Sequence, residues 1–303
     1  TNGQTIRLVR TLARDVGDPL TYYKEADWGP EGIRLVYMDA LAGDTTTHIY
    51  LTAIDADAGL ADAWADDPIM SRLLAGEASV RLTPDDGIDH YEAAFSPDGS
   101  RIAYYGMSGT SLSDIYVMNS DGSDVVRVTN TPDLSEHAIS WSLDSQWLAF
   151  AADIDGTSQI FMVPAAGGEP TQITTAGPHN YSPIWFPSGE RLYFASKPEE
   201  GAVGYIQSIS ITGNDVFTHH EVLPDILGAD AFVDSMALHS DGEVLAYIRA
   251  QLTFSSPEIA PEITSSLHLL TLDTGDMITP VWDGDPKPAL IGLKWRMILP
   301  HVP

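Results

Sequence analysis

A recurring stretch of about a dozen residues constrains this chain more than any other feature. Its clearest copy runs from Ala94 to Tyr105 and reads AFSPDGSRIAYY. Related copies lie at residues 27–37, 140–150, 184–194 and 237–247. Self-similarity at a regular period indicates a fold built from repeated units that pack against their neighbours.

Each copy is typical of a strand, a tight turn and a second strand. The turn is Pro-Asp-Gly or a relative, in which proline presets φ and glycine supplies positive φ. The alternating apolar residues after the turn predict a half-buried strand. Two more strands are expected in each unit, such as 114–117 and 125–129 after the clearest copy. Four antiparallel strands per unit predict a β-propeller blade.

The spacing of the copies predicts the number of blades. Phe95, Trp141 and Trp185 are about 45 residues apart, close to the roughly 40–50 residues of a propeller repeat. We therefore expect an all-β, six-bladed propeller that forms a single domain over residues 1–303. Because Trp295 begins a last copy, and residues 5–10 resemble a fourth strand, both termini are expected to share the sixth blade, which removes exposed strand edges. The expected blades cover residues 21–84, 89–130, 135–175, 179–224 and 231–281, and 288–303 joined with 1–15.

The longest spacing, between the first two copies, predicts an insertion in the first full blade. Leu60 and Trp64 lie four residues apart, and Ile69, Leu73 and Leu74 continue an apolar stripe. This periodicity predicts one or two short helices that lie on the blade. They are either a packed decoration or a lid or docking element.

The repeat resembles the TolB-like propeller family, whose PD40-type repeats are related to WD40 repeats. The copy at residues 91–129 carries the resemblance, with Phe-Ser-Pro-Asp-Gly followed by Asp-Ile-Tyr-Val-Met and Val-Val-Arg-Val-Thr. The family includes periplasmic Tol-system proteins and the N-terminal domains of prolyl oligopeptidase-like enzymes. The resemblance implies a non-catalytic binding module that presents a propeller mouth to a protein partner or small ligand, in the periplasm or at the cell surface.

Charge and composition narrow the range of partners. The chain has 15 basic and 43 acidic residues, a net charge of −28, which repels nucleic acid and anionic membranes and favours a monomer. No apolar run reaches the roughly 18 residues of a membrane span, so no insertion is expected. The lack of cysteine excludes disulfides and cysteine-bound metals, and it suits a secreted protein. Because Thr1 is not an initiator methionine, a processed or trimmed start is expected.

No established catalytic motif occurs, so no catalytic residue and no cofactor are assigned. The sequence lacks Gly-x-Ser-x-Gly, a glycine-rich phosphate loop and His-Glu-x-x-His. Residues 153–159 resemble a calcium loop, but Asp-Gly there is also ordinary hairpin chemistry. Two enzyme alternatives stay open: a polysaccharide lyase or hydrolase that uses the channel, as oligogalacturonate lyases do with a histidine-bound metal, or the propeller of a larger prolyl oligopeptidase-like enzyme.

The candidate ligand site lies where the first strand of each blade enters the ring. Polar and aromatic residues recur there at equivalent positions, so they are expected to converge at one mouth of the channel. They either bind a ligand or ion, or only hydrate a water-filled channel. The candidate residues are His90, Tyr91, Glu92, Glu136, His137, His179, Asn180, Tyr181 and Asp234.

Overall fold

The structure is a computed structural model of the chain. It describes residues 26–40, 46–53, 64, 67–109, 112–175, 179–197, 204–213, 215–222, 230–238, 242–253, 262–272 and 277–282.

These residues form five separate four-stranded antiparallel sheets, each a meander in chain order. The first blade contains β1 (Ala26–Trp28), β2 (Arg34–Asp39), β3 (His48–Ala53) and β4 (Val80–Arg81). The second contains β5 (Asp89–Phe95), β6 (Arg101–Met107), β7 (Ser113–Asn119) and β8 (Val126–Arg127). The third contains β9 (Ser135–Trp141), β10 (Trp147–Ile154), β11 (Thr157–Pro164) and β12 (Thr171–Gln172).

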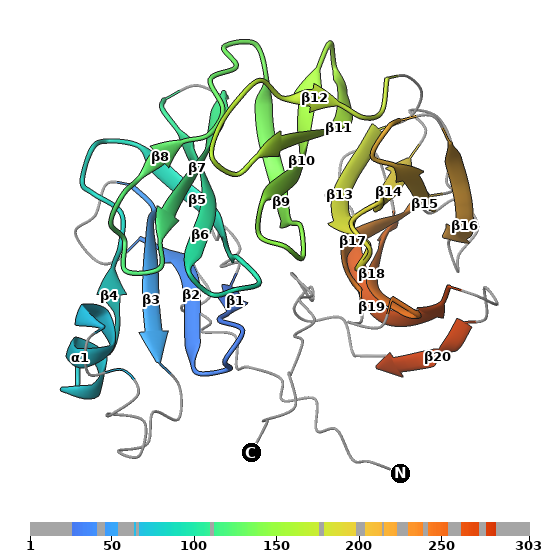
Figure 1. Ribbon diagram of the computed structural model, residues 1–303. Coiled ribbons are helices and arrows are strands. Elements are labelled where there is room, and N and C mark those ends of the chain that lie inside the picture. Colours follow the sequence, from blue (N-terminus) through green and yellow to red (C-terminus); the bar gives the residue numbers. More distant parts are fainter. Residues whose placement is uncertain are drawn as a thin grey trace.

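The fourth blade contains β13 (His179–Trp185), β14 (Arg191–Lys197), β15 (Gly204–Ser210) and β16 (Val216–Val222). The fifth contains β17 (Asp230–Leu238), β18 (Val244–Thr253), β19 (Glu262–Thr271) and β20 (Met277–Trp282). Figure 1 shows the five blades arranged in an arc, and the first strands of neighbouring blades contact one another. This is a β-propeller, as the repeat predicts.

The prediction of six blades is wrong for the described residues, which form five. The sixth blade was expected from the anchor Trp295 and a strand-like segment at residues 5–10. Neither is accompanied by the turn and alternating strand that define a complete copy. Both segments, with the expected blade at 288–303 and 1–15, lie outside the described residues.

The hydrophobic core lies between blades. One cluster joins the first and second blades through residues such as Val36, Ile49 and Tyr104. Equivalent clusters join the second to the third, the third to the fourth, and the fourth to the fifth blade. Because each cluster is built from two blades, the removal of apolar surface from water stabilises the stack of blades as well as each sheet.

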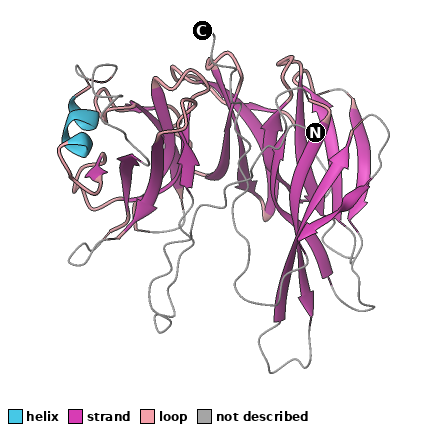
Figure 2. Ribbon diagram, turned by 90° about the horizontal axis from the view of Figure 1, so that it is seen from below, coloured by secondary structure: helices cyan, strands magenta, loops and turns pink. Residues whose placement is uncertain are grey.

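The predicted helical insertion is confirmed for its second part as α1 (Pro68–Leu74), the one helix among the described residues, whereas the part around Leu60 lies outside them. Asp67 caps it by accepting hydrogen bonds from two backbone N–H groups of the first turn. Ile69, Met70 and Leu73 pack into the cluster between the first two blades. Figure 2 shows the helix at the outer edge of the molecule, so it packs as a decoration on the first blade.

A repeated irregularity interrupts the first strands of three blades. Glu92, Ala138 and Ser182 have φ angles of 52°, 56° and 51°, and the strand register shifts there. Non-glycine residues rarely adopt this left-handed conformation, and a bulge in a strand redirects the side chains that follow. Most candidate site residues of these strands lie directly before the bulges, and Glu92 is itself a bulge residue.

Candidate functional site

The first residues of the candidate site lie inside the protein. His90, Glu136 and Asn180 occupy equivalent positions on β5, β9 and β13, and all three are buried. Buried polar groups are stable only where they are hydrogen-bonded, and each of these has partners in the loop that precedes its blade or in the neighbouring blade.

Glu136 is fully buried, with an exposed fraction of 0%. Its carboxylate accepts hydrogen bonds from the hydroxyls of Thr129 and Thr131, and its backbone carbonyl accepts one from Ser113 at 2.6 Å. Burial raises the pKa of Glu136 to about 7, although both threonine hydrogen bonds act to lower it. The side chain therefore fastens the loop between β8 and β9.

His90 and Asn180 have related roles. The Nδ1 atom of His90 lies 3.3 Å from the carbonyl oxygen of Thr47, and its ring stacks against His48 with 5.9 Å between centroids. Burial lowers the pKa of His90, so the ring is neutral near pH 7. The Nδ2 atom of Asn180 donates to Oε1 of Gln159 at 3.1 Å. Both residues connect consecutive blades.

A threonine just after the outer strand of each of the first three blades belongs to the same arrangement. Thr83, Thr129 and Thr174 each accept a hydrogen bond from the backbone N–H of a third-strand isoleucine, at 3.1, 2.8 and 2.8 Å. The hydroxyls of Thr129 and Thr174 donate to Glu136 and Gln159. The threonine that ends the repeat is therefore structural.

Glu92 also joins two blades. Its carboxylate accepts hydrogen bonds from the backbone N–H groups of Ala138 at 2.6 Å and Ile139 at 3.2 Å, both on β9. Asp27 joins the first two blades from a different repeat position, accepting from the N–H of Phe95 at 2.8 Å. The predicted site residue Glu92 thus holds the bulge of the next blade in place.

The remaining candidates are partly exposed. Tyr91, His137 and Tyr181 follow the buried residues on β5, β9 and β13, and His179 begins β13; all four are of intermediate exposure. The ring of Tyr91 stacks on Tyr105 with 5.3 Å between centroids. For Asp234 on β17 the structure describes the backbone alone.

His137 and His179 meet at the end of the third blade. The Nε2 atom of His137 lies 3.6 Å from Oδ1 of Asp153 and 3.4 Å from Oγ of Ser158. The backbone N–H of Ser158 donates to Nδ1 of His179 at 3.3 Å. A Ser-His-Asp triad needs the serine and the carboxylate on opposite ring nitrogens, whereas here both face Nε2. This cluster therefore does not have the geometry of a nucleophilic triad.

The described residues contain no group of three or more His, Asp or Glu side chains placed to hold a metal ion. The segment that resembles a calcium loop is the hairpin between β10 and β11. Its two turn residues, Asp155 and Gly156, have φ angles of 50° and 83°, as a two-residue type I′ turn requires. The hairpin interpretation of this segment is confirmed.

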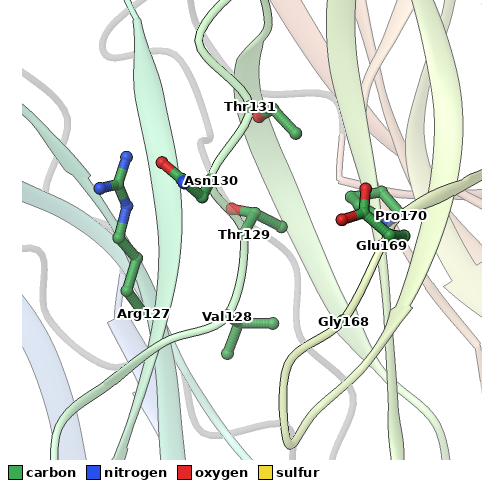
Figure 3. Close-up of a pocket in the computed structure, with 8 residues that line it drawn as sticks. All are labelled: Arg127, Val128, Thr129, Asn130, Thr131, Gly168, Glu169 and Pro170. Atoms are coloured by element: carbon green, nitrogen blue, oxygen red, sulfur yellow. The ribbon is translucent and has the colours of Figure 1, made fainter.

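Two grooves lie between blades. The first, of about 440 Å³, separates the second and third blades, and Figure 3 shows residues 127–131 on one side and 168–170 on the other. Three of its polar side chains already have partners, because Arg127 pairs with Asp114 and both threonines donate to Glu136. The second groove, of about 430 Å³, lies between the third and fourth blades beside the repeat turns and is mainly apolar.

The sequence is similar to a known family and to a known protein. The sequence profile of the TolB beta propeller domain matches residues 86–282, more than half of the chain. An uncharacterized protein of Agrobacterium fabrum is 25% identical over 254 residues, which cover 75% of this chain and 84% of that protein.

Solved structures show the same fold at low sequence identity. A candidate TolB from Agrobacterium tumefaciens superposes with a TM-score of 0.60 at 16% identity, covering 86% of this chain and 80% of that one. TolB from Acinetobacter baumannii superposes with a TM-score of 0.55 at 17% identity, covering 82% of this chain and 51% of that one. Among the described residues, no helix is long and apolar enough to cross a membrane.

Proposed function

The chain belongs to the TolB β-propeller family, and we propose that it is a non-catalytic binding module in which one mouth of the ring contacts a protein partner. The mouth is the end of the ring at which β5, β9 and β13 begin. One observation carries the proposal: aromatic or histidine residues of intermediate exposure occupy one repeat position on three consecutive blades. These residues are Tyr91, His137 and Tyr181.

The surroundings of these rings support a binding role. The residues on either side of them are committed to blade-to-blade contacts, so the rings are held on a rigid frame. Aromatic and histidine rings presented in this way give large contact area at low conformational cost. His137 and His179 add polar atoms at the rim, beside the carboxylate of Asp153.

A capture experiment tests the proposal. The wild-type protein and the double variant His137→Gln/His179→Asn are immobilised and exposed to an extract of the source organism. Asparagine keeps an acceptor for the Ser158 N–H, so the fold is expected to survive, which thermal unfolding checks. We expect at least one protein to be retained by the wild type and about tenfold less by the variant.

A matched control separates the mouth from the rest of the surface. Val126→Ser changes an exposed residue on the outer strand β8, away from the strand starts. We expect it to retain the same protein as the wild type. Equal retention by the mouth variant, or no retained protein at all, would contradict the proposed function.

The proposal includes a location outside the cytoplasm, in the periplasm or at the cell surface. The family resemblance and the absence of cysteine support it. Cell fractionation tests it, with release by osmotic shock as the expected result and retention with cytoplasmic markers as the contrary one. The lyase, hydrolase and larger-enzyme alternatives stay predictions.

A further inference from the structure

An arginine fastens the first two blade junctions in the same way. Arg34, the first residue of β2, donates to the carbonyl of Gly99 at 3.0 Å, and its guanidinium carbon lies 4.9 Å from the Phe95 ring centroid. Arg101, the first residue of β6, donates to the carbonyl of Ser145 and lies 5.0 Å from the Trp141 ring centroid. Each guanidinium thus stacks on the aromatic anchor of the next blade and binds its turn.

The third junction lacks this arginine. The first residue of β10 is Trp147, at the repeat position of Arg34 and Arg101. Arg191 holds this position in the fourth blade, but it binds Asp215 and Ser208 of its own blade. The receiving groups are nevertheless present on the fourth blade, where Trp185 and Gly189 occupy the positions of Trp141 and Ser145. The third junction therefore keeps an aromatic ring and a turn carbonyl without the cation that binds these groups at the first two junctions.

The turn glycines show that this junction is open. A Cβ atom placed on Gly99 would lie 2.8 Å from Pro30 and 3.1 Å from Arg34, and one on Gly242 would lie 2.8 Å from Phe186. At Gly189 no atom of the described part of the chain comes within 4 Å. The preceding blade therefore covers the turns at Gly99 and Gly242 and leaves the turn at Gly189 uncovered.

The apolar groove of about 430 Å³ occupies this opening. Its lining includes Trp185 and Gly189, which are the receiving groups, and Leu143 and Trp147 from the third blade. Leu143 and Trp147 are also two of the seven large apolar side chains that stand exposed among the described residues. Exposed apolar groups that gather at a concave surface mark an interaction site.

We propose that this groove receives an arginine side chain from a protein partner. Trp185 is 7% exposed, so the guanidinium packs against the part of that ring that lines the groove and donates to the Gly189 carbonyl, by analogy with Arg101 at Trp141 and Ser145. Apolar residues beside that arginine pack on Leu143 and Trp147. Arginine fits this site better than lysine, because its planar group stacks on a ring and donates at its edge at the same time.

Charge favours such an occupant. Asp144 lines the groove, and hydrogen bonds from the Ser142 hydroxyl and the Gln146 N–H lower the pKa of its carboxyl, which is therefore ionised at neutral pH. The net charge of −28 also attracts a basic partner over a longer range. The groove lies beside the repeat turns, at the other ends of the strands from the proposed mouth, so this inference does not depend on the mouth.

A blocked dipeptide tests the site directly. N-acetyl-leucyl-arginine amide is titrated into the full chain, and the indole N–H signals of Trp147 and Trp185 are followed by NMR, assigned with Trp147→Phe and Trp185→Phe. We expect a saturable shift of the Trp185 signal. The same peptide with citrulline, which is neutral and nearly isosteric, is expected to bind at least about tenfold more weakly.

Two variants make the test specific. Trp147→Arg supplies the guanidinium from within the chain, so the peptide is expected to lose its effect on Trp185. Trp147→Phe keeps an apolar ring without a cation, so binding is expected to persist. The proposal is overturned if the citrulline peptide binds equally well, if Trp147→Arg leaves binding unchanged, or if the arginine peptide leaves the Trp185 signal unmoved. None of these outcomes depends on capture at the mouth.

Discussion

Glu136 shows how a single buried carboxyl links the fold to pH. Its pKa is about 7 in the folded protein, against an ordinary value of 4.5. The folded state therefore binds a proton more tightly than the unfolded chain does. The resulting stabilisation is fully present below pH 4.5, and it is lost as pH rises through about 7.

Replacing Glu136 with glutamine should flatten this dependence. The amide fits the same space and keeps an acceptor for one threonine hydroxyl, but it does not titrate. Between about pH 5 and 8, we expect the free energy of unfolding of the wild type to fall about 2–3 kcal/mol further than that of Glu136→Gln. Urea unfolding at the two pH values measures this, and parallel curves for the two proteins would contradict it.

The sequence placed the candidate residues at the starts of the first strands but did not give the direction of each side chain. Alternation along a strand separates two faces, yet it does not say which one turns towards the neighbouring blade. The bulges at Glu92, Ala138 and Ser182 interrupt that alternation, and nothing in those three residue types predicts them. Glu136 and Glu92 thus looked like ligand-binding carboxylates, whereas both make contacts within the scaffold.

The arginines at the junctions could have been found from the sequence. Arg34 and Arg101 stand at one position of the repeat, and Trp147 departs from it in the third copy. The departure is visible in an alignment of the copies. Its meaning requires the structure, because only the packing shows that Arg34 and Arg101 reach the next blade, whereas Arg191 at the same position binds Asp215 of its own blade.

At the scale of strands, the outer edge of the fourth blade differs from those of the first three. The outer strands β4, β8 and β12 have two residues each, whereas β16 has seven. Val216 and Phe217 on β16 are 57% and 59% exposed. A long, apolar edge strand can pair with another chain, and short strands are one way in which proteins avoid this.

Phe217→Lys should therefore reduce aggregation on heating. A lysine on an edge strand opposes pairing with a second copy, and we expect a later onset of light scattering with little change in the unfolding temperature. Val126→Lys on the two-residue strand β8 is the matched control. Both changes make the net charge less negative by the same amount. If both variants delayed the onset of light scattering equally, the net charge and not the edge strand β16 would be responsible.

The hairpins and blades were the most predictable elements. Proline, aspartate and glycine at fixed places in the repeat determine the turns, and alternation determines the strands. The insertion was predictable from the apolar spacing of Ile69 and Leu73. These signals are local, so one sequence is sufficient to read them.

At the scale of the whole molecule, the number of blades was harder to predict, because ring closure depends on contacts between distant segments. The copy at Trp295 is incomplete, and its assignment to a shared blade relied on the general need to remove strand edges. The described residues form five blades, joined by four core clusters of similar composition. A scaffold of this kind is stabilised largely by nearest-neighbour contacts.

The net charge of −28 acts against that scaffold as a whole. Like charges repel more strongly in the compact state than in the unfolded chain, and salt screens them within about 8 Å at physiological ionic strength. We therefore expect the unfolding temperature to rise by a few degrees when sodium chloride increases from about 0.02 to 0.5 M. Differential scanning calorimetry at neutral pH measures the shift.

Acid should reproduce part of the salt effect, because protonation of exposed carboxylates also reduces repulsion. At about pH 5, where the net charge is less negative, the same increase in salt is expected to raise the unfolding temperature by less than at pH 7. The Glu136→Gln variant separates the effect of this buried carboxyl from the effect of the surface charge. It removes the titration of residue 136 and leaves the surface charge in place. If salt lowered the unfolding temperature at neutral pH, the ion pairs between strands, such as Arg191 with Asp215, would contribute more to stability than the overall repulsion removes.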